Sequence, residues 1–191
     1  MKKKITIGGI GSVLLGDDGI GPYVAGVLEA EYGFEDGVTV VDLGTPGLDL
    51  VAHLSGIDVV ILIDSVKNDK PAGSVTLYRK EDILRHGPEP VRMDPHSPAL
   101  SESLMIADLT GQGPDEILLI GITGKQYDAA GLSQTAERAA ETAVHAVLAE
   151  LDRLGISYRE LRKETFSAWW NPIAEALPAD DSIAIAPPVL S

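Results

Sequence analysis

The feature that most constrains this chain is an unbroken apolar run, VVILI at residues 59–63, held between Asp58 and Asp64. The run is rich in β-branched residues and does not alternate with polar ones, which is typical of a strand buried on both faces. Such a strand needs helices above and below its sheet. The run therefore predicts the central strand of a layered α/β fold, with Asp64 at its end.

Shorter patterns on either side of this run support the same architecture. Strands are predicted at 4–9, 38–42, 74–78 and 116–122. Helices are predicted from Ile20 to a stop at Gly33, at 48–54, at 80–86, at 97–109 and, capped by Ser133, through Leu151. Because strands and helices alternate, we expect a three-layer α/β sandwich: an open twisted sheet of about five strands with helices on both faces.

The change in composition near Gly155 predicts a domain at 1–155 and a C-terminal tail at 156–191. The tail holds both tryptophans, Trp169 and Trp170, and several prolines. It either packs on the domain or docks a partner, since exposed tryptophans favour interfaces.

Composition narrows the functional classes. The chain has no cysteine, which excludes disulfides, thiolate metal sites and a cysteine nucleophile. Its formal charge of 15 − 29 = −14 disfavours nucleic acid as a partner. No signal-peptide pattern and no apolar run of about 18 residues is present, so we expect a cytoplasmic protein without membrane insertion.

Side chains able to carry chemistry follow three of the predicted strands. Asp17 and Asp18 come after the first strand, Asp64 ends the central one, and His96 lies in a proline-rich loop after the strand at 74–78. Loops at the carboxyl ends of strands are where open α/β sheets bind ligands. Two carboxylates and an imidazole suit a borderline divalent metal with one position left open. Either neighbouring aspartate can instead cap the following helix.

A nucleotide site is a competing interpretation. Gly9-Ile10-Gly11 resembles the start of a dinucleotide fingerprint, and Asp42 stands where a ribose-binding acid would. The third glycine is replaced by Leu14, and the two aspartates would repel a pyrophosphate. Serine hydrolases and zincin proteases are disfavoured too, since neither G-x-S-x-G nor H-E-x-x-H occurs.

Five segments together resemble the hydrogenase maturation protease family. They are GIGSVLLGDDGIG at 9–21, DLGTPG at 42–47, VILID at 60–64, DPH at 94–96 and LLIGI at 118–122, and the resemblance spans roughly residues 4–155. Two positions depart from the family pattern: Ser12 replaces an asparagine, and Leu43 replaces a glycine. Neither is an expected metal ligand, so we expect altered local hydrogen bonding with activity retained.

The resemblance implies an endopeptidase that removes the C-terminal extension of a nickel-loaded [NiFe]-hydrogenase large-subunit precursor. It implies catalytic and metal-binding roles for Asp18, Asp64 and His96. Substrate contacts are expected from Asp17, Asp42, Gly44 and Thr45. The metal expected is Ni²⁺ carried by the substrate, with Zn²⁺ or Cd²⁺ able to occupy the site in vitro. The expected partner is the precursor, met by a monomer.

Two other functions stay open at this level. One is a checkpoint protein that binds the nickel-loaded subunit without cutting it. The other is a nucleotide-binding α/β enzyme. The sequence does not identify which hydrogenase is processed, which bond is cut, or whether Asp17 or Asp18 acts as general base.

Overall fold

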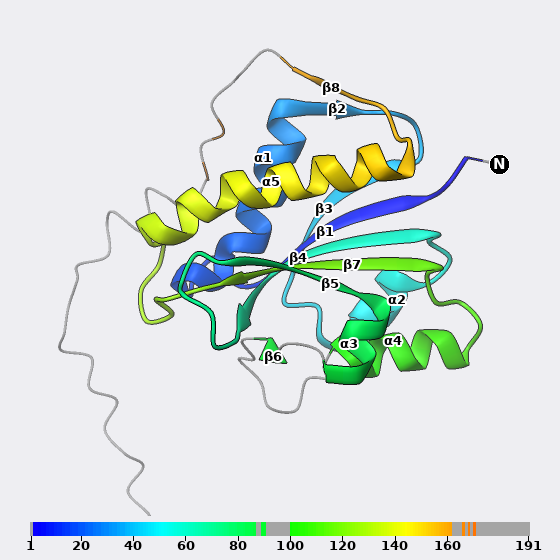
Figure 1. Ribbon diagram of the computed structural model, residues 1–191, viewed down its shortest axis with the longest axis horizontal. Coiled ribbons are helices and arrows are strands. Elements are labelled where there is room, and N and C mark those ends of the chain that lie inside the picture. Colours follow the sequence, from blue (N-terminus) through cyan, green and yellow to red (C-terminus); the bar gives the residue numbers. More distant parts are fainter. Residues whose placement is uncertain are drawn as a thin grey trace, which may run out of the picture.

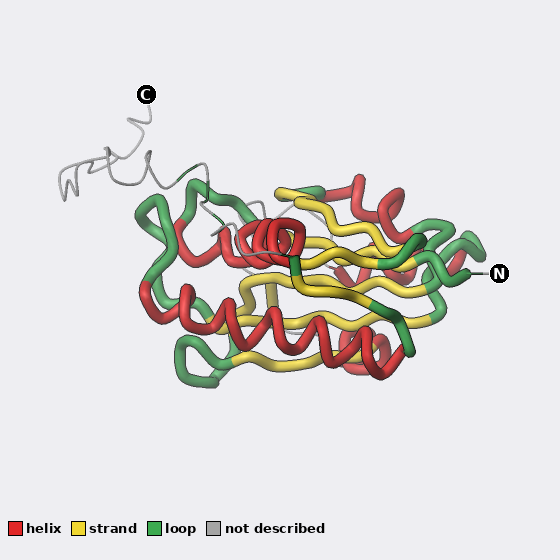
Figure 2. The backbone as a smooth tube through the Cα atoms, turned by 90° about the horizontal axis from the view of Figure 1, so that it is seen from above, coloured by secondary structure: helices red, strands yellow, loops and turns green. Residues whose placement is uncertain are grey.

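A computed structural model describes residues 2–86, 89–90, 100–161, 166, 168 and 170. Its main sheet has the strand order β3-β1-β4-β7-β5, with β6 paired to the far end of β4. The five strands of this path are β1 (Ile5–Ile10), β3 (Val38–Gly44), β4 (Val59–Lys67), β5 (Val75–Arg79) and β7 (Glu116–Thr123). They lie side by side along the length of the domain (Figure 2). The predicted α/β sandwich is confirmed.

Helices cover both faces of the sheet (Figure 1). α1 (Ile20–Glu31) and α5 (Gln134–Leu154) pack over one core, which contains Ile61 and Ile63 of β4. α2 (Leu50–Leu54), α3 (Lys80–His86) and α4 (Leu100–Leu109) cover the other, which contains Val60 and Leu62. Successive side chains of β4 thus enter opposite cores, as the continuous apolar run predicted.

The ends of the long helix follow from its sequence. Ser133 accepts a hydrogen bond from the Ala136 N–H at 3.2 Å, and Gly155 ends the helix with a φ of +71°. The predicted N-cap is therefore confirmed, and the left-handed residue at the C-cap is one that glycine adopts without strain.

The predicted helix stop at Gly33 is wrong. α1 ends at Glu31, and Gly33 lies in β2 (Tyr32–Phe34), which pairs antiparallel with β8 (Tyr158–Glu160). The aromatic rings of Tyr32 and Tyr158 meet edge to face, with centroids 6.1 Å apart. A partner strand about 125 residues away decides this pairing, so local helix signals could not reveal it.

The folded part of the chain extends past residue 155. Beyond β8, the ring of Phe166 meets Tyr23 of α1 edge to face at 5.5 Å and Trp170 at 6.4 Å. A side chain on Gly26 would collide with the Phe166 ring, so the ring packs directly against the backbone at this glycine. Trp169 falls outside the described residues.

Two strand predictions need correction because they affect the site. β4 continues to Lys67, so Asp64 lies inside the strand and pairs with Gly121 of β7, while pairing with β1 stops at Ile63. β5 is antiparallel to β7, so its carboxyl end lies at the opposite end of the sheet from the aspartates. The chain returns through α3 to β6 (Glu89–Pro90), which pairs with Val66 and Lys67 of β4.

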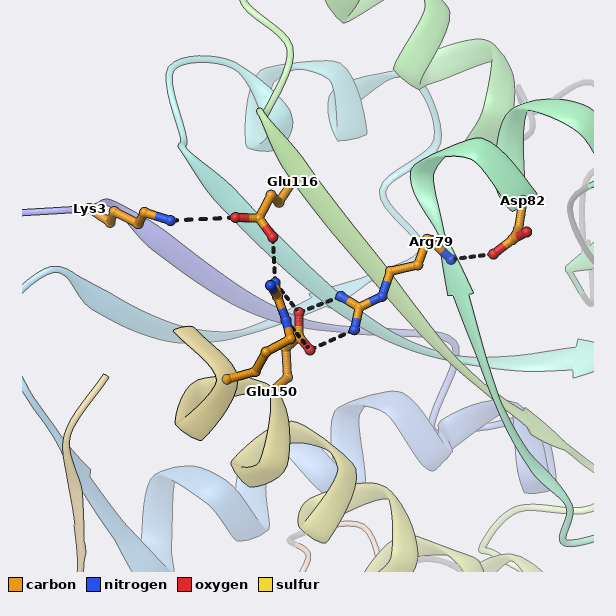
Figure 3. Close-up of polar contacts among 6 residues, drawn as sticks. Lys3, Arg79, Asp82, Glu116 and Glu150 are labelled. Atoms are coloured by element: carbon orange, nitrogen blue, oxygen red, sulfur yellow. Dashed lines mark hydrogen bonds and ion pairs between the residues drawn. The ribbon is translucent and has the colours of Figure 1, made fainter. Parts of the chain in front are cut away.

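Polar groups at the amino ends of the parallel strands form an ion-pair network (Figure 3). Arg79, at the end of β5, binds both carboxylate oxygens of Glu150 on α5. Arg153 binds Glu150 and Glu116, and Glu116 also pairs with Lys3. The network ties α5 to three strands at the end of the domain away from the aspartates.

No helix among the described residues combines the length and apolarity needed to cross a bilayer.

Candidate functional site

The aspartate pair reaches the carboxyl end of the sheet because α1 begins unusually close to it. A Cβ on Gly9 would lie 2.3 Å from the Gly21 carbonyl oxygen, and a Cβ on Gly21 would lie 2.2 Å from that of Ile10. Only glycine fits on either side of this contact. The contact brings η1 (Gly16–Gly19), which contains Asp17 and Asp18, over the ends of β1 and β4.

The packing of the fingerprint glycines argues against a nucleotide site. Gly11 has a φ of +131°, and a Cβ there would lie 1.8 Å from the carbonyl oxygen of Asp18. The space that a pyrophosphate would need beside the fingerprint glycines is taken by this chain's own backbone. The glycines pack the loop and helix instead of opening a phosphate site.

Asp17 is a structural anchor. It is 1% exposed, and its carboxylate accepts the N–H groups of Lys125, Gln126 and Ser133 at 2.7–3.0 Å. The Ser133 hydroxyl donates a further bond at 3.0 Å. Both carboxylate oxygens are thus engaged with the loop between β7 and α5. This geometry favours a structural role over the substrate contact expected from the sequence.

Asp18 is buried too, but its carboxylate is less well satisfied. One oxygen, Oδ2, accepts the Ser12 N–H at 2.6 Å, and no described residue donates a hydrogen bond to the other. Burial raises the pKa of Asp18 above its usual value, and the bond from Ser12 opposes that rise only in part. Asp18 therefore has an oxygen available for a ligand.

Asp64, on β4, is also buried. It is 8% exposed, and burial holds its pKa well above the usual value. The nearby charge of Asp18 raises the pKa further, and the Ser65 N–H opposes the rise. Two desolvated carboxylates that repel each other are stabilised when a cation binds between them. These two residues fit a divalent metal.

His96, the third predicted ligand, lies outside the described residues. Among the residues that are described, no group of three metal-ligating side chains occurs. The positions on either side of His96 are known: Pro90 pairs with Val66, two residues after Asp64, and α4 starts at Leu100. α4 packs on the face of the sheet that holds Leu62 and Val66, the face to which alternation also assigns Asp64.

The segment DLGTPG at 42–47 lies at the carboxyl end of β3. Gly44 has a φ of +55° and open space where a side chain would lie, and its carbonyl accepts the Gly11 N–H at 2.8 Å. Asp42 accepts the Gly44 N–H at 2.8 Å, so it shapes the turn. Thr45 is exposed beside them. Contact of Gly44 and Thr45 with a substrate stays a prediction.

The two residues that depart from the family pattern, Ser12 and Leu43, are each accommodated by their neighbours. Ser12 accepts the Leu14 N–H through its hydroxyl at 3.4 Å, so a polar side chain still bonds within the turn. Leu43 lies over Gly8 of β1, with Cδ1 2.5 Å from where a Cβ of that glycine would stand. The larger side chain at position 43 is accommodated by the absence of one opposite.

Sequence reasoning missed the hydroxyl pair beside Asp64. The Tyr127 hydroxyl lies 2.9 Å from the Ser65 hydroxyl, linking the loop after β7 to β4. Burial raises the pKa of Tyr127, and the bond with Ser65 opposes that rise. No motif contains Tyr127, so only its place in the fold connects it with the site.

Comparisons with known proteins agree on one family. The family model of hydrogenase maturation proteases, HycI, matches residues 22–150. The hydrogenase 2 maturation protease of Escherichia coli is 30% identical over 155 residues, which are 80% of this chain and 93% of that protein. The hydrogenase expression/formation protein HupM of Azotobacter chroococcum is 32% identical over 155 residues, 80% of this chain and 73% of that protein.

A solved structure shows the same architecture. The hydrogenase maturating endopeptidase HybD from E. coli superposes with a TM-score of 0.74 at 28% identity, covering 82% of this chain and 97% of that one. The family model spans the segments at 42–47, 60–64, 94–96 and 118–122, and the segment at 9–21 directly precedes it. This chain belongs to the hydrogenase maturation protease family.

Proposed function

We propose that this protein is an endopeptidase that removes the C-terminal extension from a nickel-loaded [NiFe]-hydrogenase large-subunit precursor, acting as a monomer. The observation that carries the proposal is the pair of desolvated carboxylates, Asp18 and Asp64, at the carboxyl end of the sheet. The names of the relatives support the same reaction, since they are maturation proteases of hydrogenases.

In this proposal Asp18, Asp64 and His96 bind the nickel that the precursor already contains. A bound divalent metal polarises the scissile carbonyl or activates a water molecule. Recognition of nickel would limit cleavage to loaded precursors, because a nickel-free chain offers nothing for the two carboxylates to bind. Zn²⁺ or Cd²⁺ can replace nickel at the site in vitro.

The role of general base falls to Asp18. Asp17 was the alternative, but its oxygens already accept four hydrogen bonds. Asp18 keeps one oxygen without a donor from the described residues, and burial raises its pKa above the usual value. It can hold the proton of an attacking water while Asp64 fixes the geometry.

The test is the intact mass of a cognate large-subunit precursor after incubation with this protein. We expect loss of a single C-terminal peptide with nickel-loaded precursor, and no loss with nickel-free precursor. His96→Ala should abolish cleavage, while the exposed His53→Ala serves as the matched control and should cleave normally. Equal cleavage of loaded and nickel-free precursor would contradict nickel recognition.

The same experiment separates this function from a checkpoint role. A stable complex with loaded precursor and no change in mass would favour the non-catalytic checkpoint protein. A third outcome is that the protein neither binds nor cleaves a precursor that a family relative does process. That outcome would reject both functions.

A further inference from the structure

A large apolar side chain projects from the loop that leads to Asp18. Leu14 is 60% exposed. Among the described residues, the other exposed large apolar side chains lie on β5, α3 and α4, and they are Leu77, Leu84, Met105, Ile106 and Leu109. Leu14 alone in this set stands in a loop of the candidate site. Single exposed apolar residues are ordinary on a protein surface, and what sets Leu14 apart is its place in the loop that leads to Asp18.

The loop that carries Leu14 is fastened at both ends to Asp18. At one end, the Ser12 N–H donates to the Asp18 carboxylate at 2.6 Å. At the other, the Asp18 N–H donates to the Leu15 carbonyl at 3.1 Å. The side chain at the tip is therefore held at a fixed position relative to the catalytic carboxylate.

Bonds inside the loop hold the tip itself. The Leu14 N–H donates to the Ser12 hydroxyl at 3.4 Å, and the Leu15 N–H donates to the Ser12 carbonyl at 3.1 Å. Gly16, next in the chain, contacts the carbonyl oxygen of Gln126, where a Cβ would lie only 2.4 Å away. These contacts hold the loop in a conformation that presents the Leu14 side chain to solvent.

We infer that Leu14 is a specificity-determining contact that binds an apolar side chain of the precursor beside the scissile bond. The inference rests on the proposed function, in which the substrate is a polypeptide that must be aligned with Asp18. Contact with an aliphatic or aromatic side chain would remove Leu14 from water, which is favourable for both partners. Since the loop is fixed to Asp18, the same contact adds binding affinity for a precursor whose apolar side chain lies next to the site.

The test compares two exposed leucines changed in the same way. Leu14→Ser removes the apolar contact at the site. Leu109→Ser is the matched control, because Leu109 is 85% exposed and ends α4, ahead of the amino end of β7 and so away from the site. Both variants should keep the melting temperature of the wild type, since neither side chain packs in a core.

Cleavage of nickel-loaded cognate precursor is then measured over a range of precursor concentrations. We expect Leu14→Ser to raise KM roughly tenfold with kcat at saturation little changed, and Leu14→Met to restore most of the wild-type KM. Leu109→Ser should leave both constants unchanged. Binding of the precursor to immobilised protein should weaken by the same factor as KM rises.

The outcomes distinguish this inference from the proposed function. If the wild type cleaves and Leu14→Ser has the wild-type KM, the inference is overturned and the function stands. An equal rise in KM for Leu14→Ser and Leu109→Ser also overturns it, because the effect would then be a general one of surface polarity. If the wild type neither binds nor cleaves the precursor, both proposals fall.

Discussion

Two neighbouring aspartates show how far the environment decides what a residue does. Asp17 and Asp18 have the same side chain and are both buried. Asp17 receives four hydrogen bonds from the loop between β7 and α5, while Asp18 receives one and keeps a raised pKa. A well-bonded buried carboxylate stabilises a fold, whereas a poorly bonded one costs stability and remains available to a ligand.

Asparagine at positions 17 and 64 should therefore have opposite effects on stability. Asp17→Asn should lower the free energy of unfolding by about 3 kcal/mol, because the amide presents donors to main-chain N–H groups that need an acceptor. Asp64→Asn should keep or raise stability, since it removes a desolvated charge, yet it should lower the cleavage rate by at least about 100-fold. Urea denaturation and the precursor assay give the two measurements.

Two results would contradict these assignments of Asp17 and Asp64. If Asp17→Asn unfolds at the wild-type urea concentration, the four bonds at Asp17 contribute nothing, and its assignment as an anchor is wrong. A large loss of stability in Asp64→Asn would likewise show that Asp64 holds the fold together, and its burial with no cationic partner among the described residues argues against that.

At the scale of elements, the close approach of α1 to the sheet positions the site. Gly21 lies against the carbonyl oxygens of both Ile10 and Ile63, where a Cβ would come within 2.4 Å of each. Alanine is normally the better helix former by about 1 kcal/mol. Here a methyl group would push the start of α1, and η1 with it, away from the strands.

Gly21→Ala should consequently destabilise the protein by about 3 kcal/mol and remove cleavage activity from the molecules that remain folded. Gly26→Ala is the matched control on the same helix, since a Cβ there meets only the ring of Phe166. That variant should displace the ring and leave the activity of the folded protein intact. Circular dichroism during heating and the specific activity of soluble protein report the two effects. Full activity in Gly21→Ala would contradict the packing argument.

At the scale of the whole molecule, the two ends of the sheet differ in how their charged side chains are paired. The carboxyl end holds carboxylates that are poorly satisfied, and the amino end holds the paired network of Arg79, Glu150 and Arg153 (Figure 3). Burial alone would raise the pKa of Glu150, but the hydrogen bonds from the two arginines outweigh it and lower the pKa below its usual value. The paired charges of this network thus lie away from the candidate site.

The lowered pKa of Glu150 predicts how stability depends on pH. A carboxylate with a lower pKa in the folded state adds stability above its unfolded pKa of about 4.3, and this stability is lost as the pH falls through the folded value. Glu150→Gln should therefore cost about 1–2 kcal/mol at pH 7, a figure kept small because both arginines are partly exposed to solvent. The difference from wild type should shrink as the pH falls below about 4.3 and disappear once the pH is below the folded pKa of Glu150.

Denaturant unfolding of both proteins across this pH range checks the prediction. Asp36→Asn is the control, since its pair with Lys2 is almost fully exposed and should contribute nothing measurable. A difference between Glu150→Gln and wild type that stays constant from pH 7 to pH 3 would show that charge at Glu150 is not its source.

The sequence by itself determined the layers and the pieces of the site. The run at 59–63 required cover on both faces, and the motifs placed aspartates at 17, 18 and 64. Patterns of this kind are local, because burial period and turn chemistry depend on residues a few positions apart. Burial period and turn chemistry alone do not separate Asp17 from Asp18, and only the family resemblance gave the two residues different expected roles.

Only the tertiary structure decided the rest, because each remaining point depends on contacts between distant segments. The antiparallel direction of β5 and the return through β6 came from pairing across the sheet. The anchoring of Asp17 by the loop at 125–133 and the hydroxyl pair of Ser65 and Tyr127 came from packing of loops that lie far apart in sequence. Contacts between segments that are distant in sequence leave no periodic signal, so their effects appear only once the chain is folded.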